Sequence, residues 1–418
     1  MRKNIITGVS LVALSAGTAQ AGGFELQTLD TSIMYADGNA GSISIADINA
    51  SVSGSREGVT TDTVKDQTVT NIALKMDAGL VDVGLYTYRS GAIQLSGGND
   101  LNNNYAPTGD VDINSTTLMA SYDINENISF LGGITQNNLT SGNVTTIKGG
   151  YDIKSGSSTG YVFGAAYSIP DIAFRAEVLY QPQSKVSTRT TYDGSLQSAF
   201  SGAALKQAGE DAFIAALSNG DSVEDATLAA EDATDLNDPN SDGTAAVVAA
   251  ATAAMGLNGD YDTEVSRPET LTVNLQTGIA ADTLMFASYH RAKWSGAPVV
   301  VDVASAADGD INPKIDETFG DSEKFTIGLG RKFSDKLSGS LSYSKEEGGG
   351  DTATSLFTFS NGTETLSAGL RYTVDNMDIS FGVSHSQLGD VTVDGGAGDI
   401  VYKGNSVTAM GVKIAFAF

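Results

Sequence analysis

The residues of this chain best suited to bind a ligand are basic residues in segments where apolar and polar side chains alternate. If these segments are β-strands with apolar side chains facing outward, the residues between them face the interior. Five cations then face inward: Lys75, Arg175, Lys332, Arg371 and Lys413. An arginine beside apolar walls can hold a carboxylate through charge-assisted hydrogen bonds, so these five are candidates for binding a ligand carboxylate. The alternative is internal pairing, for example of Arg175 with Glu177, or pairing with Asp378 and Asp123.

Other site chemistry has little support in the sequence. The two histidines, His290 and His385, have no carboxylate cluster near them in the sequence, and the chain lacks a P-loop and a GxSxG motif. The segment DPNSDG places Asp238, Asn240 and Asp242 at calcium-loop spacing, but Ala249 stands where a bidentate glutamate is needed. We therefore expect no enzyme and no cofactor, and we interpret this segment as an Asx-rich turn with an incomplete calcium ligand set.

Composition narrows the class of protein. The 418 residues carry a formal charge of −26, which argues against a nucleic-acid partner because a phosphate-binding face would be basic. The absence of cysteine excludes disulfides and thiolate metal sites. Glycine is abundant (48 residues) and proline scarce (7), which together with many Tyr and Phe favours a strand-rich chain with tight turns.

The first 21 residues have the pattern of a secretory signal peptide. Arg2 and Lys3 precede an apolar stretch at 5–16, and Ala19-Gln20-Ala21 forms a small-x-small cleavage site. No later stretch reaches the length of an apolar membrane helix. If the exported chain crosses a membrane, we expect it to do so as a closed barrel.

The elements that would position the basic residues are alternating segments of about ten residues, joined in turn by short turns and by long polar loops. They predict strands near 41–54, 67–77, 81–92, 113–124, 127–139, 158–169, 172–184, 268–280, 283–297, 323–333, 336–346, 363–374, 377–388 and 405–418. We therefore predict an all-β fold in which residues 41–418 form a 14-stranded antiparallel transmembrane β-barrel. The even number places both termini in the periplasm, with Phe416 and Phe418 in an aromatic girdle. A soluble β-sandwich explains the leader, the turn rhythm and the final Phe less well.

Two segments fall outside this pattern. Residues 22–40 show no alternation, and we expect them to enter the lumen as an N-terminal hatch or plug; the alternative is a loose periplasmic tail. Residues 195–262 are Ala-rich and acidic with apolar residues near helical spacing, which predicts a partly helical extracellular loop insertion. The alternative for this insertion is a partly disordered acidic loop.

Several stretches of the chain resemble one known family. The mature start GGFELQ and the segments 161–180, 275–295, 328–339 and 405–418 are similar to the outer-membrane long-chain fatty acid transporters, the FadL/TodX family. Lys293, Trp294 and Ser295 match that family's Trp-Ser signature on the strand after the long loop, whereas its Asn-Pro-Ala segment is missing near 48–54. The resemblance implies a 14-stranded barrel with a hatch, here a shorter one. It further implies contact with outer-membrane lipid and lipopolysaccharide, and assembly by the barrel-insertion machinery.

The resemblance also implies a route for the ligand, from an outer groove to a lumen pocket and then sideways through a kinked third strand. The kink would lie where alternation breaks, and the gate candidates are Arg89, Ser90, Gly91, Tyr86 and Tyr88. The capture-groove candidates in the insertion are Phe213, Leu217, Val247, Val248 and Met255.

The expected function is passive outer-membrane transport of long-chain fatty acids or other hydrophobic compounds through a plugged barrel with lateral exit. A general diffusion porin for small polar solutes is the main alternative. A barrel whose acidic loop serves surface binding is another.

Overall fold

The computed structural model describes residues 25–56, 58–97, 106–146, 148–194, 212–234, 256–303, 314–348, 352–353, 355–394 and 399–418. The predicted signal peptide lies outside these residues.

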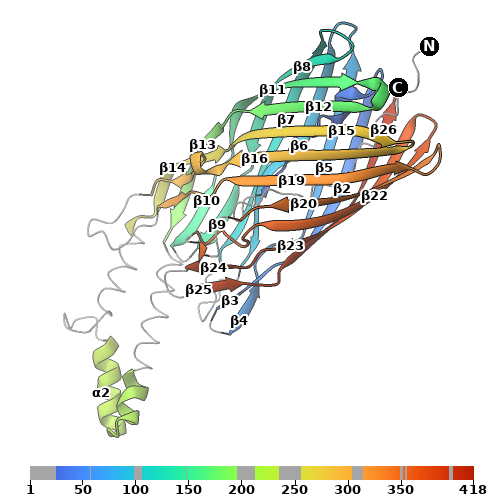
Figure 1. The fold of residues 1–418 in the computed structure, drawn as a ribbon. Helices are drawn as coiled ribbons and strands as arrows, with labels where there is room; N and C mark the ends of the chain where they lie inside the picture. Colours follow the sequence, from blue (N-terminus) through green and yellow to red (C-terminus); the bar gives the residue numbers. More distant parts are fainter. Residues whose placement is uncertain are drawn as a thin grey trace.

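Fourteen long antiparallel strands among the described residues form one closed barrel (Figure 1). They are β2 (Ala40–Ser51), β5 (Gln67–Asp77), β6 (Asp82–Ser96), β7 (Thr108–Asp123), β8 (Ile128–Leu139), β11 (Gly156–Ile169), β12 (Phe174–Gln181), β15 (Glu269–Ala280), β16 (Thr283–Lys293), β19 (Ser322–Lys332), β20 (Leu337–Glu346), β22 (Thr363–Val374), β23 (Met377–Leu388) and β26 (Ser406–Ala417). The first of them, β2, pairs with β5 on one edge and with β26 on the other, which closes the cylinder. The predicted fold class is confirmed.

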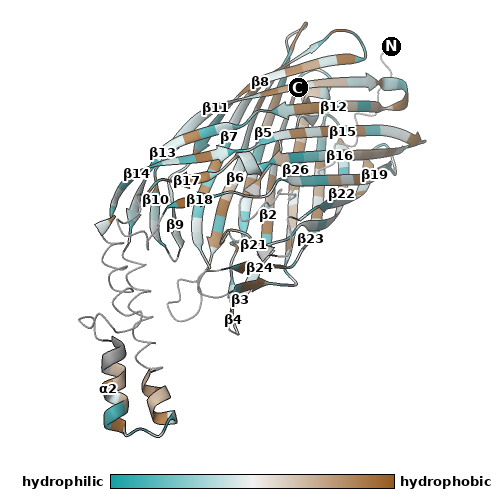
Figure 2. Ribbon diagram, turned by 60° about the vertical axis from the view of Figure 1, so that its left-hand side comes forward, coloured by the Kyte–Doolittle hydropathy of each residue, from teal (hydrophilic) through white to brown (hydrophobic). Residues whose placement is uncertain are grey.

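The outer face of the barrel is apolar because side chains alternate along each strand. In β19, for example, Phe325, Ile327 and Leu329 face outward and are each at least half exposed. The same alternation appears as bands along the strands in Figure 2. An exposed apolar surface of this extent on a closed barrel is the surface expected to face lipid.

The two ends of the barrel differ. At one end, which we call the short-turn end, consecutive strands join through connections such as 78–81, 124–127 and 333–336. The backbone there takes left-handed conformations at Ala173, Asp282 and Asp375. The C-terminus lies near this end (Figure 1).

The opposite end, which we call the long-loop end, carries eleven further short strands among the described residues. They are β3 (Ser53–Arg56), β4 (Val59–Asp62), β9 (Gly142–Thr146), β10 (Gly149–Ile153), β13 (Ser184–Asp193), β14 (Gly259–Arg267), β17 (Val299–Val301), β18 (Ile315–Glu317), β21 (Thr352–Ala353), β24 (Val391–Asp394) and β25 (Asp399–Tyr402). Apolar side chains of these strands, of the adjoining loops and of the neighbouring ends of β6 and β7 form the largest buried cluster among the described residues, with ring pairs Trp294–Phe319 at 5.8 Å and Phe359–Tyr402 at 5.4 Å.

Two predictions about the long-loop end need correction. The ninth strand ends at Lys293, and Trp294 and Ser295 lie in the short helix η3 (Trp294–Gly296), because the chain turns there to bury the indole. The predicted insertion also extends too far, since residues 259–262 belong to β14, which pairs with β13. Within the insertion, residues 212–218 and α2 (Val223–Thr234) are helical, as predicted. No helix in the described part of the chain is long and apolar enough to span a membrane.

The N-terminal segment lies inside the barrel. Its regular elements are β1 (Glu25–Leu26) and the short helix η1 (Ser32–Tyr35). The apolar side chains Leu29, Ile33 and Met34 are buried against inward-facing residues of β6, β7, β8 and β11. We refer to residues 25–39 as the hatch.

Candidate functional site: a strand gap, a hatch and a lumen cavity

The barrel wall has a gap between β5 and β6. Their pairing stops at Ile72 and Thr87, and farther along only an isolated bridge joins Val64 to Leu95. Residues 67–71 of β5 still pair with β2, and β6 still pairs with β7 along its length. The two segments therefore separate between the Ile72–Thr87 pair and the Val64–Leu95 bridge, although β5 remains paired with β2 and β6 with β7.

A bulge in β6 accompanies the gap. The register between β6 and β7 shifts between Arg89 and Gly91, so Ser90 is the extra residue. The Ser90 hydroxyl is buried and lies 2.6 Å from that of Ser115, which donates to Asn137 at 2.6 Å. Asn137 in turn donates to Ser184 at 3.1 Å. This buried polar row holds the bulge against three neighbouring strands.

The hatch fills the gap. Leu26 pairs with Gly91, and the Gln27 amide donates to the Ser90 carbonyl at 3.2 Å, so β1 takes the place beside β6 that β5 leaves. On the same stretch, Arg89 donates to the Gln67 side chain of β5 and forms an ion pair with Asp112 of β7 at 3.6 Å. The gap is thus closed by side chains and a two-residue strand instead of a continuous ladder.

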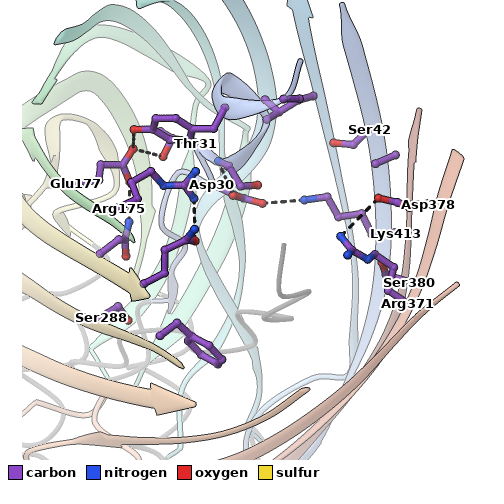
Figure 3. Close-up of a pocket in the computed structure, with 18 of the residues that line it drawn as sticks. Asp30, Thr31, Ser42, Arg175, Glu177, Ser288, Arg371, Asp378, Ser380 and Lys413 are labelled. Atoms are coloured by element: carbon purple, nitrogen blue, oxygen red, sulfur yellow. Dashed lines mark hydrogen bonds and ion pairs between the residues drawn. The ribbon is translucent and has the colours of Figure 1, made fainter. Parts of the chain in front are cut away.

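The lumen on the opposite side contains a cavity of about 550 Å³. Its walls come from the hatch, β2 and the strands from β12 to β26, and it reaches the short-turn end at Asp375 and Asn376. Many of the lining residues carry hydroxyl groups, among them Ser42, Ser288, Ser342, Thr365 and Ser380. Figure 3 shows the charged residues of this cavity and their contacts.

The inward cations that the sequence predicted are internally paired. Lys413 forms an ion pair with Asp30 at 2.9 Å, and Arg371 with Asp378 at 3.5 Å (Figure 3). Lys75 is buried, pairs with Asp82 at 2.9 Å and donates to the Ala36 carbonyl of the hatch. These contacts follow the alternative left open by the sequence, in which the cations neutralise neighbouring carboxylates.

Two of the five candidates differ from this pattern. Arg175 stacks over the Tyr35 ring at 3.9 Å and donates to Gln276 at 3.2 Å. The prediction that Lys332 is a lumen cation is wrong. Lys332 is the last residue of β19, pairs with Asp335 across the turn and does not line the cavity.

Glu177 joins the hatch to the cavity wall. Its carboxylate is buried and accepts hydrogen bonds from Thr31 at 2.7 Å, Tyr35 at 2.6 Å and Asn274 at 2.8 Å (Figure 3). Burial and the adjacent Glu177 raise the pKa of Tyr35, so its hydroxyl remains a donor. The hatch is thereby held by hydrogen bonds on one side and by apolar packing on the other.

Asp30 holds a second contact between hatch and wall. Its side chain lies inside the barrel but is 59% exposed, facing the cavity. Burial opposes its ionisation, but the charge of Lys413 and the hydrogen bonds from Ser32 outweigh that effect and lower the pKa of Asp30 to about 2.

Lys324 and His290 are lumen residues that the sequence analysis did not select as ligand candidates. They are register partners on β16 and β19, and both line the cavity. His290 is 7% exposed, its Nδ1 lies 2.9 Å from Thr272, and its Nε2 has no hydrogen-bond partner among the described residues. Alternation points to Lys324, since it directly precedes the outward Phe325.

The remaining predicted site residues are placed as follows. Tyr86 and Tyr88 face inward and are 3% and 5% exposed. Phe213 and Leu217 lie in the short helix at 212–218. Val247, Val248 and Met255 of the capture groove, and Asp238, Asn240 and Asp242 of the calcium candidate, lie outside the described residues.

These features define a class of protein: a closed 14-stranded barrel with an internal hatch and a bulged strand beside a gap in its wall. Solved structures of the same architecture include a Pseudomonas aeruginosa FadL homologue, which has a TM-score of 0.63 and 11% identity over 92% of this chain and 91% of that one. The P. putida toluene transporter TodX (TM-score 0.56, 11% identity) and the Ralstonia pickettii toluene transporter TbuX (0.54, 12%) each align over 92% of this chain and 91% of theirs. No protein-family model and no curated protein matches the chain. The structural likeness confirms the fold that the sequence resemblance implied.

Proposed function

We propose that this protein is a passive outer-membrane channel for hydrophobic compounds, including long-chain fatty acids, which leave sideways through the gap between β5 and β6. The fold supports this proposal, because similar barrels include a FadL homologue and two toluene transporters. The apolar outer belt supports placement in a membrane.

The observation that carries the proposal is the interrupted pairing of β5 and β6. The outward residues on the short-turn side of the gap, such as Ile72 and Leu85, are apolar, whereas Thr70 and Thr68 beside the gap are polar. The gap therefore lies at the edge of the apolar belt. A hydrophobic molecule that leaves there reaches lipid beside the apolar residues on the short-turn side of the gap.

Lys324 and His290 support a ligand with a carboxylate. Lys324 makes no ion pair within 4 Å to the described residues, in contrast to Lys413, Arg371 and Lys75. An ammonium and a neighbouring unpaired imidazole nitrogen at the inner end of a cavity suit an anionic headgroup. We therefore prefer Lys324 to the five earlier candidates as the headgroup cation.

Lateral exit can be tested with an engineered disulfide, because the chain has no cysteine that could compete for pairing. A disulfide between Leu26→Cys and Gly91→Cys, which are register partners, would hold β1 against β6 and keep the gap filled. We expect uptake of a fluorescent fatty acid into proteoliposomes to cease under oxidising conditions and to return on reduction. The matched control, Ser51→Cys with Ser406→Cys, bridges the continuous β2–β26 seam and leaves uptake unchanged. Full uptake by the oxidised 26–91 variant would refute lateral exit.

The hydroxyl-lined cavity favours one competing function, a porin for small polar solutes. The cavity already reaches the short-turn end, so displacement of the hatch would extend this water-accessible space farther through the lumen. Planar-bilayer recordings separate the two functions, because a plugged barrel conducts little and a porin conducts steadily. A steady large conductance of the unmodified protein would replace our proposal with the porin.

Capture of the ligand by the insertion is part of the same proposal. Leu217 is 39% exposed on the helix at 212–218, and Ile214 beside it is 59% exposed. Deleting residues 196–257 removes these side chains but keeps the β13–β14 hairpin. We expect weaker initial binding of a fatty acid to whole cells, and an unchanged affinity would exclude the insertion from capture.

A further inference from the structure

Two buried hydroxyl groups near the gap have no hydrogen-bond partner among the described residues. They are the phenol oxygens of Tyr86 and Tyr88, and both are shielded from solvent. Buried polar side-chain atoms are paired in the large majority of cases, so two unpaired phenols two residues apart need a physical reason. The Asn71 amide oxygen on the facing strand is a third such atom.

Tyr86, Tyr88 and Asn71 lie near the point where the β5–β6 pairing ends. The last paired residues of β5 and β6 are Ile72 and Thr87, so Asn71 and Tyr88 are the first residues beyond the end of the ladder. Tyr86 precedes Tyr88 on the same inward face. Asn71 and Tyr88 therefore lie at the inner edge of the gap, and Tyr86 lies one inward position farther toward the short-turn end.

The hatch covers these hydroxyl groups. Tyr86 and Tyr88 pack in one cluster with Leu29, Ile33 and Met34. A Cβ atom at Gly84 would lie 2.6 Å from the Met34 sulfur and 3.1 Å from the Tyr86 hydroxyl, so the phenol extends over a glycine toward the hatch. An apolar neighbour such as Met34 cannot accept a strong hydrogen bond. Displacement of the hatch would uncover two donors beside the exit.

Resting on the function proposed above, we propose that Tyr86 and Tyr88 form a transit subsite for the oxygen-bearing headgroup of the transported compound. The two phenols donate hydrogen bonds to a carboxylate, carbonyl or hydroxyl oxygen as it moves from the lumen to the gap. The unpaired amide oxygen of Asn71 on the facing strand can accept a hydrogen bond from a hydroxyl or a protonated carboxyl headgroup. The subsite favours an amphiphile over a plain hydrocarbon, because only the amphiphile satisfies these groups.

The test compares palmitate with hexadecane, which has the same number of carbon atoms and no headgroup. We expect the double variant Y86F/Y88F to lower the palmitate-to-hexadecane uptake ratio in proteoliposomes roughly tenfold, the effect of about one charge-assisted hydrogen bond. Hexadecane uptake stays the same. The melting temperature does not fall, because the removed hydroxyl groups had no partner in the closed state.

The matched control is Tyr192→Phe at the long-loop end. The Tyr192 hydroxyl donates to the Lys148 carbonyl at 2.7 Å, so its removal lowers the melting temperature and leaves the uptake ratio unchanged. An unchanged ratio in Y86F/Y88F, or a fall in melting temperature as large as that of Y192F, overturns the subsite. If the unmodified protein carries palmitate in either case, the proposed function survives. If the unmodified protein carries neither probe, the function and the subsite are both rejected.

Discussion

The two sides of the lumen are built differently although the same kind of strand forms both. From β6 to β11 the inward residues beside the hatch, among them Tyr86, Met119 and Leu131, pack against Leu29, Ile33 and Met34, whereas polar inward residues such as Ser115 and Asn137 bond to one another. From β12 to β26 they are mostly hydroxyl or charged groups around a cavity of about 550 Å³. The outer face is apolar on both sides, so the difference lies entirely in the alternate residues that lipid never contacts. A barrel can therefore carry an apolar route and a polar cavity in one lumen, separated by the hatch.

Glu177 offers the strongest test of the polar side. Replacing it with Ala leaves three donors of the hatch and wall without their acceptor, which we expect to destabilise hatch docking by roughly 3 kcal/mol. Single-channel conductance should rise, because the hatch would leave the cavity wall. Glu177→Gln, which keeps an acceptor oxygen, should show a much smaller rise. Unchanged conductance in both variants would mean that the apolar side alone holds the hatch.

Ile33 tests the apolar side. It is 8% exposed in the hatch cluster, and truncation to Ala should cost about 2 to 3 kcal/mol of docking energy through lost burial and a residual cavity. We expect faster proteolysis of the hatch in detergent. Ile43 on the outer face is 39% exposed, so Ile43→Ala is the matched control and should leave the proteolysis rate unchanged.

The Asp30–Lys413 pair predicts a pH dependence of the polar side. The pKa of Asp30 falls from an ordinary 3.8 to about 2, so its contribution is present above about pH 4 and is lost as the pH falls toward 2. Hatch proteolysis by an acid-stable protease should therefore accelerate over that interval. In the Asp30→Asn variant, the hatch should be cleaved at one rate between pH 4 and pH 2. The substitution should cost less than about 1 kcal/mol of hatch-docking free energy, because the ion pair faces the cavity. The same acceleration in both proteins would assign the effect to other carboxylates.

Lys332 should give the smallest effect. It is a half-buried residue at the short-turn end, and its ammonium group pairs with nearby Asp335. Lys332→Ala should leave fatty-acid affinity unchanged, whereas Lys324→Ala should weaken it about tenfold or more through loss of a charge-assisted contact. Equal losses in the two variants would show that the cavity responds to overall charge and has no specific headgroup cation.

Alternation explains why the barrel could be predicted from sequence. Phe325, Ile327 and Leu329 must face lipid, and a one-residue error would turn all of them inward, so the pattern determines both strand and face. The same rule places Lys324 in the lumen. It does not tell which inward cation is paired, because pairing depends on residues such as Asp30 in a segment without periodicity.

The corrected regions depend on tertiary contacts. Trp294 follows a strand in continuous register, but the strand ends at Lys293, where the indole packs against the loop residue Phe319. The bulge at Ser90 could be predicted, since alternation breaks there. The filling of the gap by Leu26 could not be predicted, because the two-residue strand β1 is too short to show an alternating pattern.

The hydroxyl groups of the cavity wall have a consequence for the proposed passage of an amphiphile. Serine and threonine hydroxyls bind water, so a hydrocarbon chain that entered the cavity would displace that water without forming equivalent contacts, whereas a headgroup at Lys324 would replace it. The cavity would thus hold the polar end of the molecule and leave its chain on the apolar side of the hatch.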